Sequence, residues 1–286
     1  MIIWLFPDTF FSNLGTIAER TGLELGLKGK GAIVTAASKG IGLGVARVLA
    51  SEGCKVMISS RSQDSIQQAT KKIVEQTGNR EVYGISANLT IKDDIERLLE
   101  SAGQRIGRID VLAYNTGPPK PGTFADLSDE DWESGVKLLL LSATRLAKGV
   151  LPGMVQNHWG RLIFITSTTL RQPIGNLLLS DTVRLSVAGL SKSLATEYGP
   201  KGITSNGIMQ GHILTDRQRE IAMDVSKRTG GSVENAMKQA LAEVPAGRYG
   251  TVEEVGYLTA FLASDLAGYI NGAMIPIDGG MIRSTF

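Results

Sequence analysis

Short apolar runs alternate with longer amphipathic stretches along this chain from about residue 25 onward. Each run is rich in β-branched residues and is bounded by glycine or polar residues, a pattern typical of a strand that is buried on both faces. We therefore predict seven strands, at Ala32–Thr35, Lys55–Ser60, Val82–Ala87, Val111–Asn115, Arg161–Thr166, Thr204–Ile208 and Ala273–Ile277.

The stretches between these runs carry apolar residues at the 3.6-residue period of a helix. One of them covers Ile41–Glu52. Two others begin with capping sequences, Ser128 followed by Asp131 and Thr251 followed by Glu254. Strands that alternate with helices in this way predict a single α/β domain, a doubly wound parallel sheet covered by helices on both faces.

Two segments fall outside this alternation. Residues 1–24 begin with the apolar run MIIWLF, but Pro7 and Asp8 interrupt it and no basic region precedes it, so we expect neither a signal peptide nor a membrane span. We interpret this extension as an arm packed on the surface or on a partner subunit, or as the result of a misassigned start site. Within the main domain, residues 25–286, the polar stretch 216–244 predicts a lid over the substrate site.

Composition narrows the classes of function. The 286 residues include 30 basic and 28 acidic side chains, and no basic stripe carries interleaved aromatic residues, so we expect no nucleic-acid partner. Cys54 is the only cysteine, which excludes an internal disulfide and favours a cytoplasmic location. His158 and His212 are the only histidines and lie far apart in the sequence, so we expect no dedicated zinc site.

The first strand leads into a glycine-containing turn and then a helix. Thr35 is followed by Ala-Ala-Ser-Lys and by Gly40-Ile41-Gly42, although Val45 takes the third glycine position of the GxGxxG pattern. A turn of this kind presents backbone N–H groups to a phosphate at the helix N-terminus. The alternative is a tight turn that binds nothing.

The second strand ends in Ser59-Ser60-Arg61, without the acid that an NAD site uses to hold the ribose 2′-hydroxyl. Arg61 and Lys39, with the hydroxyls of Ser38 and Ser60, suit a 2′-phosphate instead, because a guanidinium donates several hydrogen bonds to phosphate oxygens. This pattern favours NADP(H). The alternative is that Arg61 merely begins a solvated helix.

From Leu25 to Gly280 the chain resembles the short-chain dehydrogenase/reductases, especially members that act on 3-oxoacyl thioesters. Residues 35–42 resemble the TGxxxGxG turn, residues 114–117 the NNAG motif, residues 210–211 a Pro-Gly pair, and residues 278–280 the C-terminal signature. The resemblance implies a Rossmann-type sheet in the order 3-2-1-4-5-6-7. It implies cofactor contacts at Thr35, Ser38, Lys39, Gly40, Ile41, Gly42, Arg61, Asn88, Leu89, Asn115, Gly117, Ile213 and Thr215.

The catalytic positions depart from this family, whose members use Asn, Ser, Tyr and Lys. The serine is present as Ser167, but the tyrosine position holds Ser180, the lysine position holds Arg184 and the asparagine position holds Leu139. A serine hydroxyl does not readily ionise, and an arginine stays charged, so the usual phenol acid is missing.

Three interpretations remain open for a site with Ser167, Ser180 and Arg184. In the first, the protein still reduces a ketone or oxidises an alcohol with NADP(H): the serines bind the carbonyl, water fills the space of the missing ring, and Arg184 anchors the ribose and stabilises the oxyanion. In the second, the site is non-redox, as in dehalogenase-like family members. In the third, the protein binds a nucleotide without catalysis, as a regulatory module.

Other residues have more than one interpretation. His212 is either a replacement acid or an exposed loop histidine, and Tyr114 is interpreted as a packing residue. The predicted helices Asp131–Leu151 and Leu179–Glu197 are apolar on more than one face, so one face requires a cover besides the sheet. We expect a homodimer or homotetramer that pairs these helices, with no membrane partner.

Overall fold

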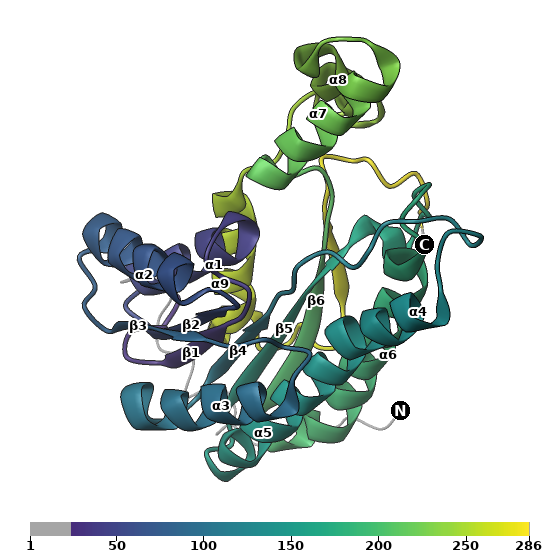
Figure 1. Ribbon diagram of the computed structural model, residues 1–286. Coiled ribbons are helices and arrows are strands. Elements are labelled where there is room, and N and C mark those ends of the chain that lie inside the picture. The colour runs from purple at the N-terminus through teal and green to yellow at the C-terminus, as the bar shows by residue number, and fades with distance from the viewer. Residues whose placement is uncertain (1–23, 286) are drawn as a thin grey trace, which may run out of the picture.

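A computed structural model describes residues 24–285 (Figure 1). Its centre is a seven-stranded, all-parallel sheet with the order β3-β2-β1-β4-β5-β6-β7. The strands are β1 (Gly31–Val34), β2 (Lys55–Ser60), β3 (Val82–Ser86), β4 (Val111–Tyr114), β5 (Gly160–Ser167), β6 (Ile203–Gln210) and β7 (Met274–Ile277). The predicted strands are confirmed, because runs buried on both faces leave little freedom in where a strand lies. The order that the family resemblance implied is confirmed as well.

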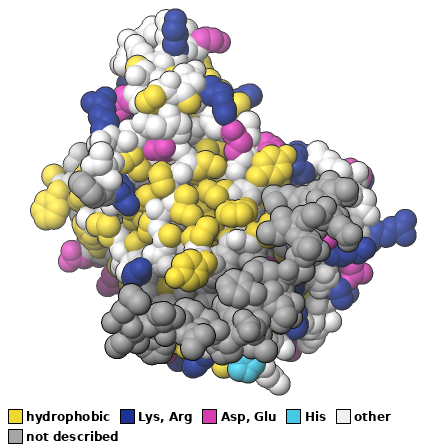
Figure 2. Space-filling view, turned by 180° about the vertical axis from the view of Figure 1, so that it is seen from behind, with side chains coloured by type: hydrophobic (Ala, Val, Ile, Leu, Met, Phe, Trp, Pro, Cys, Tyr) yellow, Lys and Arg dark blue, Asp and Glu magenta, His cyan; other side chains and the backbone are white. Residues whose placement is uncertain are grey.

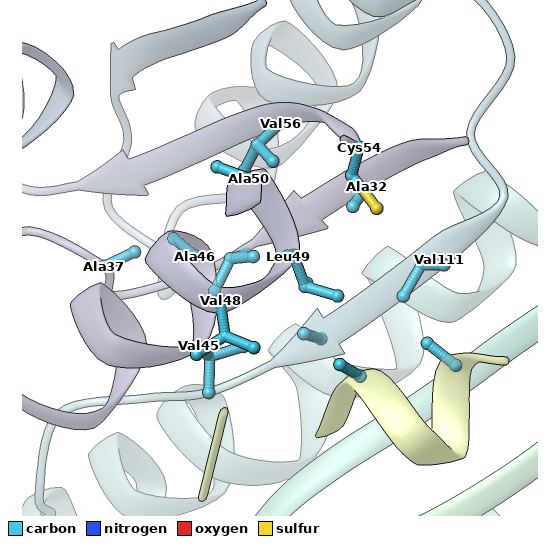
Figure 3. Packing of buried hydrophobic residues seen from close by; sticks show 14 of the residues in the cluster. Ala32, Ala37, Val45, Ala46, Val48, Leu49, Ala50, Cys54, Val56 and Val111 are labelled. Atoms are coloured by element: carbon cyan, nitrogen blue, oxygen red, sulfur yellow. The ribbon is translucent and has the colours of Figure 1, made fainter. Parts of the chain in front are cut away.

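Helices cover both faces of the sheet (Figure 1). One face carries α1 (Gly40–Ser51), α2 (Gln63–Thr77) and α9 (Val252–Ala263), and the other carries α3 (Lys92–Ile106), α5 (Ser142–Gln156) and α6 (Leu178–Tyr198). Figure 3 shows the small side chains of α1, among them Ala46 and Ala50, packed close to strands β1, β2 and β4. The two apolar layers fix the carboxyl ends of the strands along one edge.

The helix predicted at Asp131–Leu151 is interrupted, and the prediction of one regular helix is wrong in this respect. α4 (Asp129–Val136) passes into a π-helical turn, Lys137–Leu141, and then into α5. Such π turns occur often at functional sites. The combined helix Asp129–Gln156 is long and apolar enough to span a membrane, and in this fold it packs on the sheet through residues such as Leu146 and Val150.

The segment 216–244 forms α7 (Asp216–Thr229) and α8 (Val233–Ala240), which project beyond the carboxyl edge of the sheet (Figure 1). Thr215 caps α7 and Ser232 caps α8, each by accepting a backbone N–H bond three residues on. The predicted capping boxes at Ser128 and Thr251 are also confirmed. Of the predicted extension 1–24, only Glu24 lies within the described residues.

Candidate active site

The turn between β1 and α1 has the geometry of an anion cradle. Gly40 has a φ of +59° and Ala36 a φ of +48°, so the backbone turns sharply before the helix. A Cβ on Gly42 would lie 2.4 Å from the Ala36 carbonyl oxygen, which leaves no room for a side chain. The N-terminus of α1 has no side-chain cap and no acid in its first turn, so its N–H groups are free for a phosphate.

Two hydrogen bonds join this turn to the end of β4. Thr35 Oγ1 donates to the Asn115 carbonyl oxygen at 2.7 Å, and Asn115 N donates back to Thr35 Oγ1 at 2.9 Å. Next to them, the Thr116 hydroxyl is buried without a hydrogen-bond partner in the described structure, and a Cβ on Gly117 would meet open space. An orphaned buried hydroxyl beside free space suits a ligand rich in polar atoms, such as a nucleotide.

The end of β2 fits a phosphate better than a free ribose hydroxyl. Arg61 is exposed, and the last two strand residues, Ser59 and Ser60, supply no carboxylate. Lys39 is exposed and lies 4.0 Å from Glu220 of α7, an ion pair too open to solvent to hold it firmly. Both cations are therefore available to a 2′-phosphate, and the residues present fit NADP(H).

Asn88 is less free than the sequence suggested. Its Oδ1 accepts hydrogen bonds from Thr90 N at 3.1 Å and from Thr90 Oγ1 at 3.0 Å, so that oxygen helps to form the turn before α3. The Leu89 side chain is buried. The Asn88 backbone is also occupied, because its N–H donates to Asp94 Oδ2 at 2.7 Å and its carbonyl oxygen accepts from Ile91 N at 3.0 Å. Of the Asn88 polar atoms, the side-chain nitrogen Nδ2 is the one that remains for a ligand in the described structure.

The loop after β6 lies against the turn between β1 and α1. A Cβ on Gly40 would lie 3.5 Å from Thr215 Cγ2, so these two segments are in contact range. Ile213 is buried, and Thr215 Oγ1 accepts a bond from Gln218 N at 3.4 Å, while Ile41 packs partly buried on the α1 side of the core. The carboxyl ends of β1, β4 and β6 thus converge, as ligand sites in open parallel sheets do.

Ser180 and Arg184 lie together on α6. Arg184 Nε donates to Ser180 Oγ at 3.0 Å, and Ser180 Oγ lies 3.2 Å from Thr169 Oγ1. Ser167, at the end of β5, accepts a hydrogen bond from Thr169 N at 3.2 Å. Among residues 24–285, the predicted residues Ser167 and Ser180 are therefore linked only through Thr169, a residue that the sequence analysis missed.

Arg184 carries an unpaired charge. Among residues 24–285 no carboxylate pairs with it, and its two terminal amino groups have no hydrogen-bond partner. Burial lowers the pKa of Arg184, because the charged form loses solvation. A ligand on which negative charge develops would stabilise this guanidinium, which fits the expected role with an oxyanion.

Tyr114 locks the π turn from the end of β4. Its hydroxyl lies 2.7 Å from the Leu139 carbonyl oxygen, 3.0 Å from that of Leu138 and 2.7 Å from Ser142 Oγ. Its ring packs on Phe164 at 5.7 Å, so its interpretation as a packing residue is confirmed, and burial raises the pKa of its phenol. The Leu139 side chain is fully buried among apolar residues, so the Tyr114 hydroxyl contacts Leu139 through its backbone carbonyl oxygen.

His212 bonds to α7 rather than to the serines. Its Nδ1 lies 2.6 Å from Gln218 Nε2, and its ring meets Tyr249 edge-on at 6.1 Å. Burial lowers the pKa of His212, which favours the neutral form at neutral pH. The described structure shows no hydrogen bond from this ring to Ser167, Ser180 or Arg184, so it does not support His212 as a replacement acid.

Comparison with known proteins agrees with this architecture. A family model described as Enoyl-(Acyl carrier protein) reductase matches residues 35–282. The 3-oxoacyl-[acyl-carrier-protein] reductase FabG of Escherichia coli is 35% identical over 257 residues, which are 90% of this chain and 99% of the relative. The chain belongs to the short-chain dehydrogenase/reductase family.

Solved structures that resemble this chain include reductases of ketones. L-sorbose reductase from Gluconobacter frateurii, in complex with NADPH and L-sorbose, superposes with a TM-score of 0.88 at 30% identity, covering 92% of this chain and all of the other. A variant of actinorhodin polyketide ketoreductase with NADPH gives a TM-score of 0.84 at 30% identity, covering 89% of this chain and 98% of the other. This chain is thus a homologue of NAD(P)H-dependent ketoreductases.

Proposed function

We propose that this protein is an NADP(H)-dependent oxidoreductase that interconverts a ketone, in particular a 3-oxoacyl compound, and the secondary alcohol. The observation that carries the proposal is the pairing of an open anion cradle at α1 with an uncompensated guanidinium, Arg184, beside the Ser180 hydroxyl. The E. coli relative is named for a 3-oxoacyl substrate, and the two ketoreductase structures contain NADPH, which supports the same assignment.

The chain's own residues divide the work. The α1 N-terminus and Gly42 hold the cofactor phosphates, and Arg61 and Lys39 hold the 2′-phosphate. When bound, NADPH supplies the hydride. Ser167 and Ser180 bind the carbonyl oxygen, while Arg184 stabilises the negative charge that grows on it and holds ribose hydroxyls.

A second candidate function is nucleotide binding without turnover. The absence of a Tyr–Lys pair, with Ser180 and Arg184 in its place, favours this alternative or a non-redox reaction, whereas the open cradle favours cofactor use. NADPH consumption with a panel of ketones and 3-oxo esters separates the two. Turnover with any of them supports the reductase, and NADPH binding without turnover supports the binding module.

We predict that Arg61→Asp weakens NADPH binding by at least about tenfold and leaves NADH binding nearly unchanged, because the new carboxylate repels the 2′-phosphate. Fluorescence titration with both nucleotides measures the effect. Arg80→Asp is the matched control. Arg80 is exposed and precedes β3, so it lies at the amino ends of the strands, whereas Arg61 follows the carboxyl end of β2. Equal losses for NADH and NADPH in Arg61→Asp would show that Arg61 does not face the 2′-phosphate.

We also propose that the protein is a homo-oligomer. An apolar groove of about 480 Å³ lies between α5 and α6, lined by residues that include Leu151, Leu190 and Leu194. Apolar side chains also gather in a broad patch on the face behind, below the lid (Figure 2). Uncovered apolar surface of this kind marks an interface, and a two-fold axis lets the same helices cover one another.

Sedimentation should therefore give a mass of at least a dimer at micromolar concentration. Leu190→Asp places a carboxylate in the groove and should shift the equilibrium toward the monomer, whereas Ile91→Asp, at an exposed position before α3, should not. A monomeric mass for the unaltered protein would contradict the oligomer.

A further inference from the structure

Arg184, Ser180 and Thr169 form a chain of hydrogen bonds that has one more donor hydrogen than it uses. Arg184 Nε–H, the Ser180 hydroxyl and the Thr169 hydroxyl supply three hydrogens, and the chain that joins them contains two hydrogen bonds. The Arg184 bond always ends on Ser180 Oγ. Whichever hydroxyl donates in the second bond, the other keeps a free O–H, because neither has a further hydrogen-bond acceptor among the described residues.

Thr169 is held in place independently of this bond. It lies in the short 3₁₀ turn Thr168–Leu170 that follows β5, and its backbone N–H donates to Ser167 Oγ at 3.2 Å. The residue is 3% exposed. Thr169 is therefore held between Ser167 at the end of β5 and Ser180 on α6.

The arrangement strengthens the free O–H as a donor. A hydrogen bond from a guanidinium draws electron density from the accepting hydroxyl, and successive hydrogen bonds polarise one another in a low-dielectric site. Arg184 has no carboxylate partner in the described structure, so no counter-charge offsets its effect on this pair. A neutral hydroxyl pair thereby becomes a better hydrogen-bond donor than an isolated serine.

We propose that Thr169 is a further catalytic residue, and that Thr169 and Ser180 act together as the donor to the substrate's carbonyl oxygen. This inference rests on the proposed reductase function and deepens it. The free O–H donates a hydrogen bond to the oxygen as negative charge develops there, and neither hydroxyl ionises. The proton that completes the alcohol comes from solvent water, so the pair replaces the missing phenol as a stabiliser of charge and not as an acid.

The test compares three variants. Thr169→Val removes the hydroxyl with little change of shape and should lower kcat with a 3-oxo ester by about 10- to 100-fold, a loss typical of a weakened oxyanion donor. NADPH affinity should not change, because the proposal assigns this hydroxyl to the substrate's carbonyl oxygen and not to the cofactor. Thr169→Ser should restore most of kcat. Thr168→Val is the matched control, since Thr168 is the adjacent buried threonine and stands outside the chain of hydroxyls.

A binding measurement separates this inference from the function on which it rests. With NADP⁺ bound, ethyl acetoacetate forms a complex that cannot react, and calorimetry should show that Thr169→Val binds it about tenfold more weakly than Thr169→Ser does. If the unaltered protein turns over ketones but Thr169→Val equals it in kcat and in ketone affinity, the inference is wrong and the reductase stands. If ketones bind in a Thr169-dependent way without turnover, the donor pair stands and the reductase fails. Binding that is absent or independent of Thr169 overturns the donor pair.

Discussion

Replacing Arg184 by methionine is expected to lower kcat/KM for ketone reduction by about 10²- to 10³-fold, the effect of removing a strong oxyanion donor. The guanidinium holds Ser180 through Nε and has two further amino groups without partners in the described structure. Its removal therefore takes away a charge, ends the polarisation of the Ser180 hydroxyl and leaves that hydroxyl without its donor. NADPH affinity should fall as well, since the same side chain is expected to hold ribose hydroxyls.

Steady-state kinetics and NADPH titration measure these two effects. Arg105→Met is the control, because Arg105 lies in the last turn of α3, far from the carboxyl ends of the strands, and should leave kcat/KM unchanged. Ser180→Tyr combined with Arg184→Lys restores the family's phenol and ammonium and should raise the rate with simple ketones. Unchanged kinetics in Arg184→Met would remove Arg184 from the active site.

Gly42→Ala is expected to abolish most NADPH binding and to lower the free energy of unfolding by about 1–3 kcal/mol, the usual effect of overpacking. The added methyl group would lie 2.4 Å from the Ala36 carbonyl oxygen and 2.9 Å from Ala37 Cα. Both are backbone atoms that cannot rotate away, so the turn must open and the N–H groups at α1 must move.

Fluorescence titration and chemical unfolding measure the two consequences of Gly42→Ala separately. Gly103→Ala is the matched control, because a Cβ there meets nothing within 4 Å and the residue lies within α3. It should keep NADPH affinity and stabilise the fold by up to about 1 kcal/mol. Wild-type NADPH affinity in Gly42→Ala would mean that the phosphates do not lie on this turn.

The sheet could be predicted in detail because its signals are local. Runs such as Lys55–Ser60 are buried on both faces, and the capping sequences at Ser128 and Thr251 mark helix starts without reference to the rest of the fold. The strand order required the resemblance to a family, since periodicity alone does not say which strands are neighbours.

The candidate site was predictable only in part. Ser180 and Arg184 are four residues apart on one helix, so their contact follows from helical geometry. The Thr169–Ser180 contact joins residues 11 positions apart, and the Tyr114 bonds to the π turn join residues 24 and 25 positions apart. These contacts depend on how β4, β5 and α6 pack. Thr169 follows β5 and Tyr114 ends β4, and neither residue carries a sequence signal for its role. The leucines at 138–141 likewise give no sign of a π turn.

Deuterium transfer from NADPH labelled at nicotinamide C4 tests the central proposal most directly. The unaltered protein, incubated with the labelled cofactor and a panel of ketones and 3-oxo esters, should yield an alcohol that carries deuterium on the carbinol carbon, from one face of the nicotinamide only. Mass spectrometry and NMR of the product read this out. NADPH that binds tightly while no substrate of the panel acquires deuterium would contradict hydride transfer and would make the protein a nucleotide-binding module.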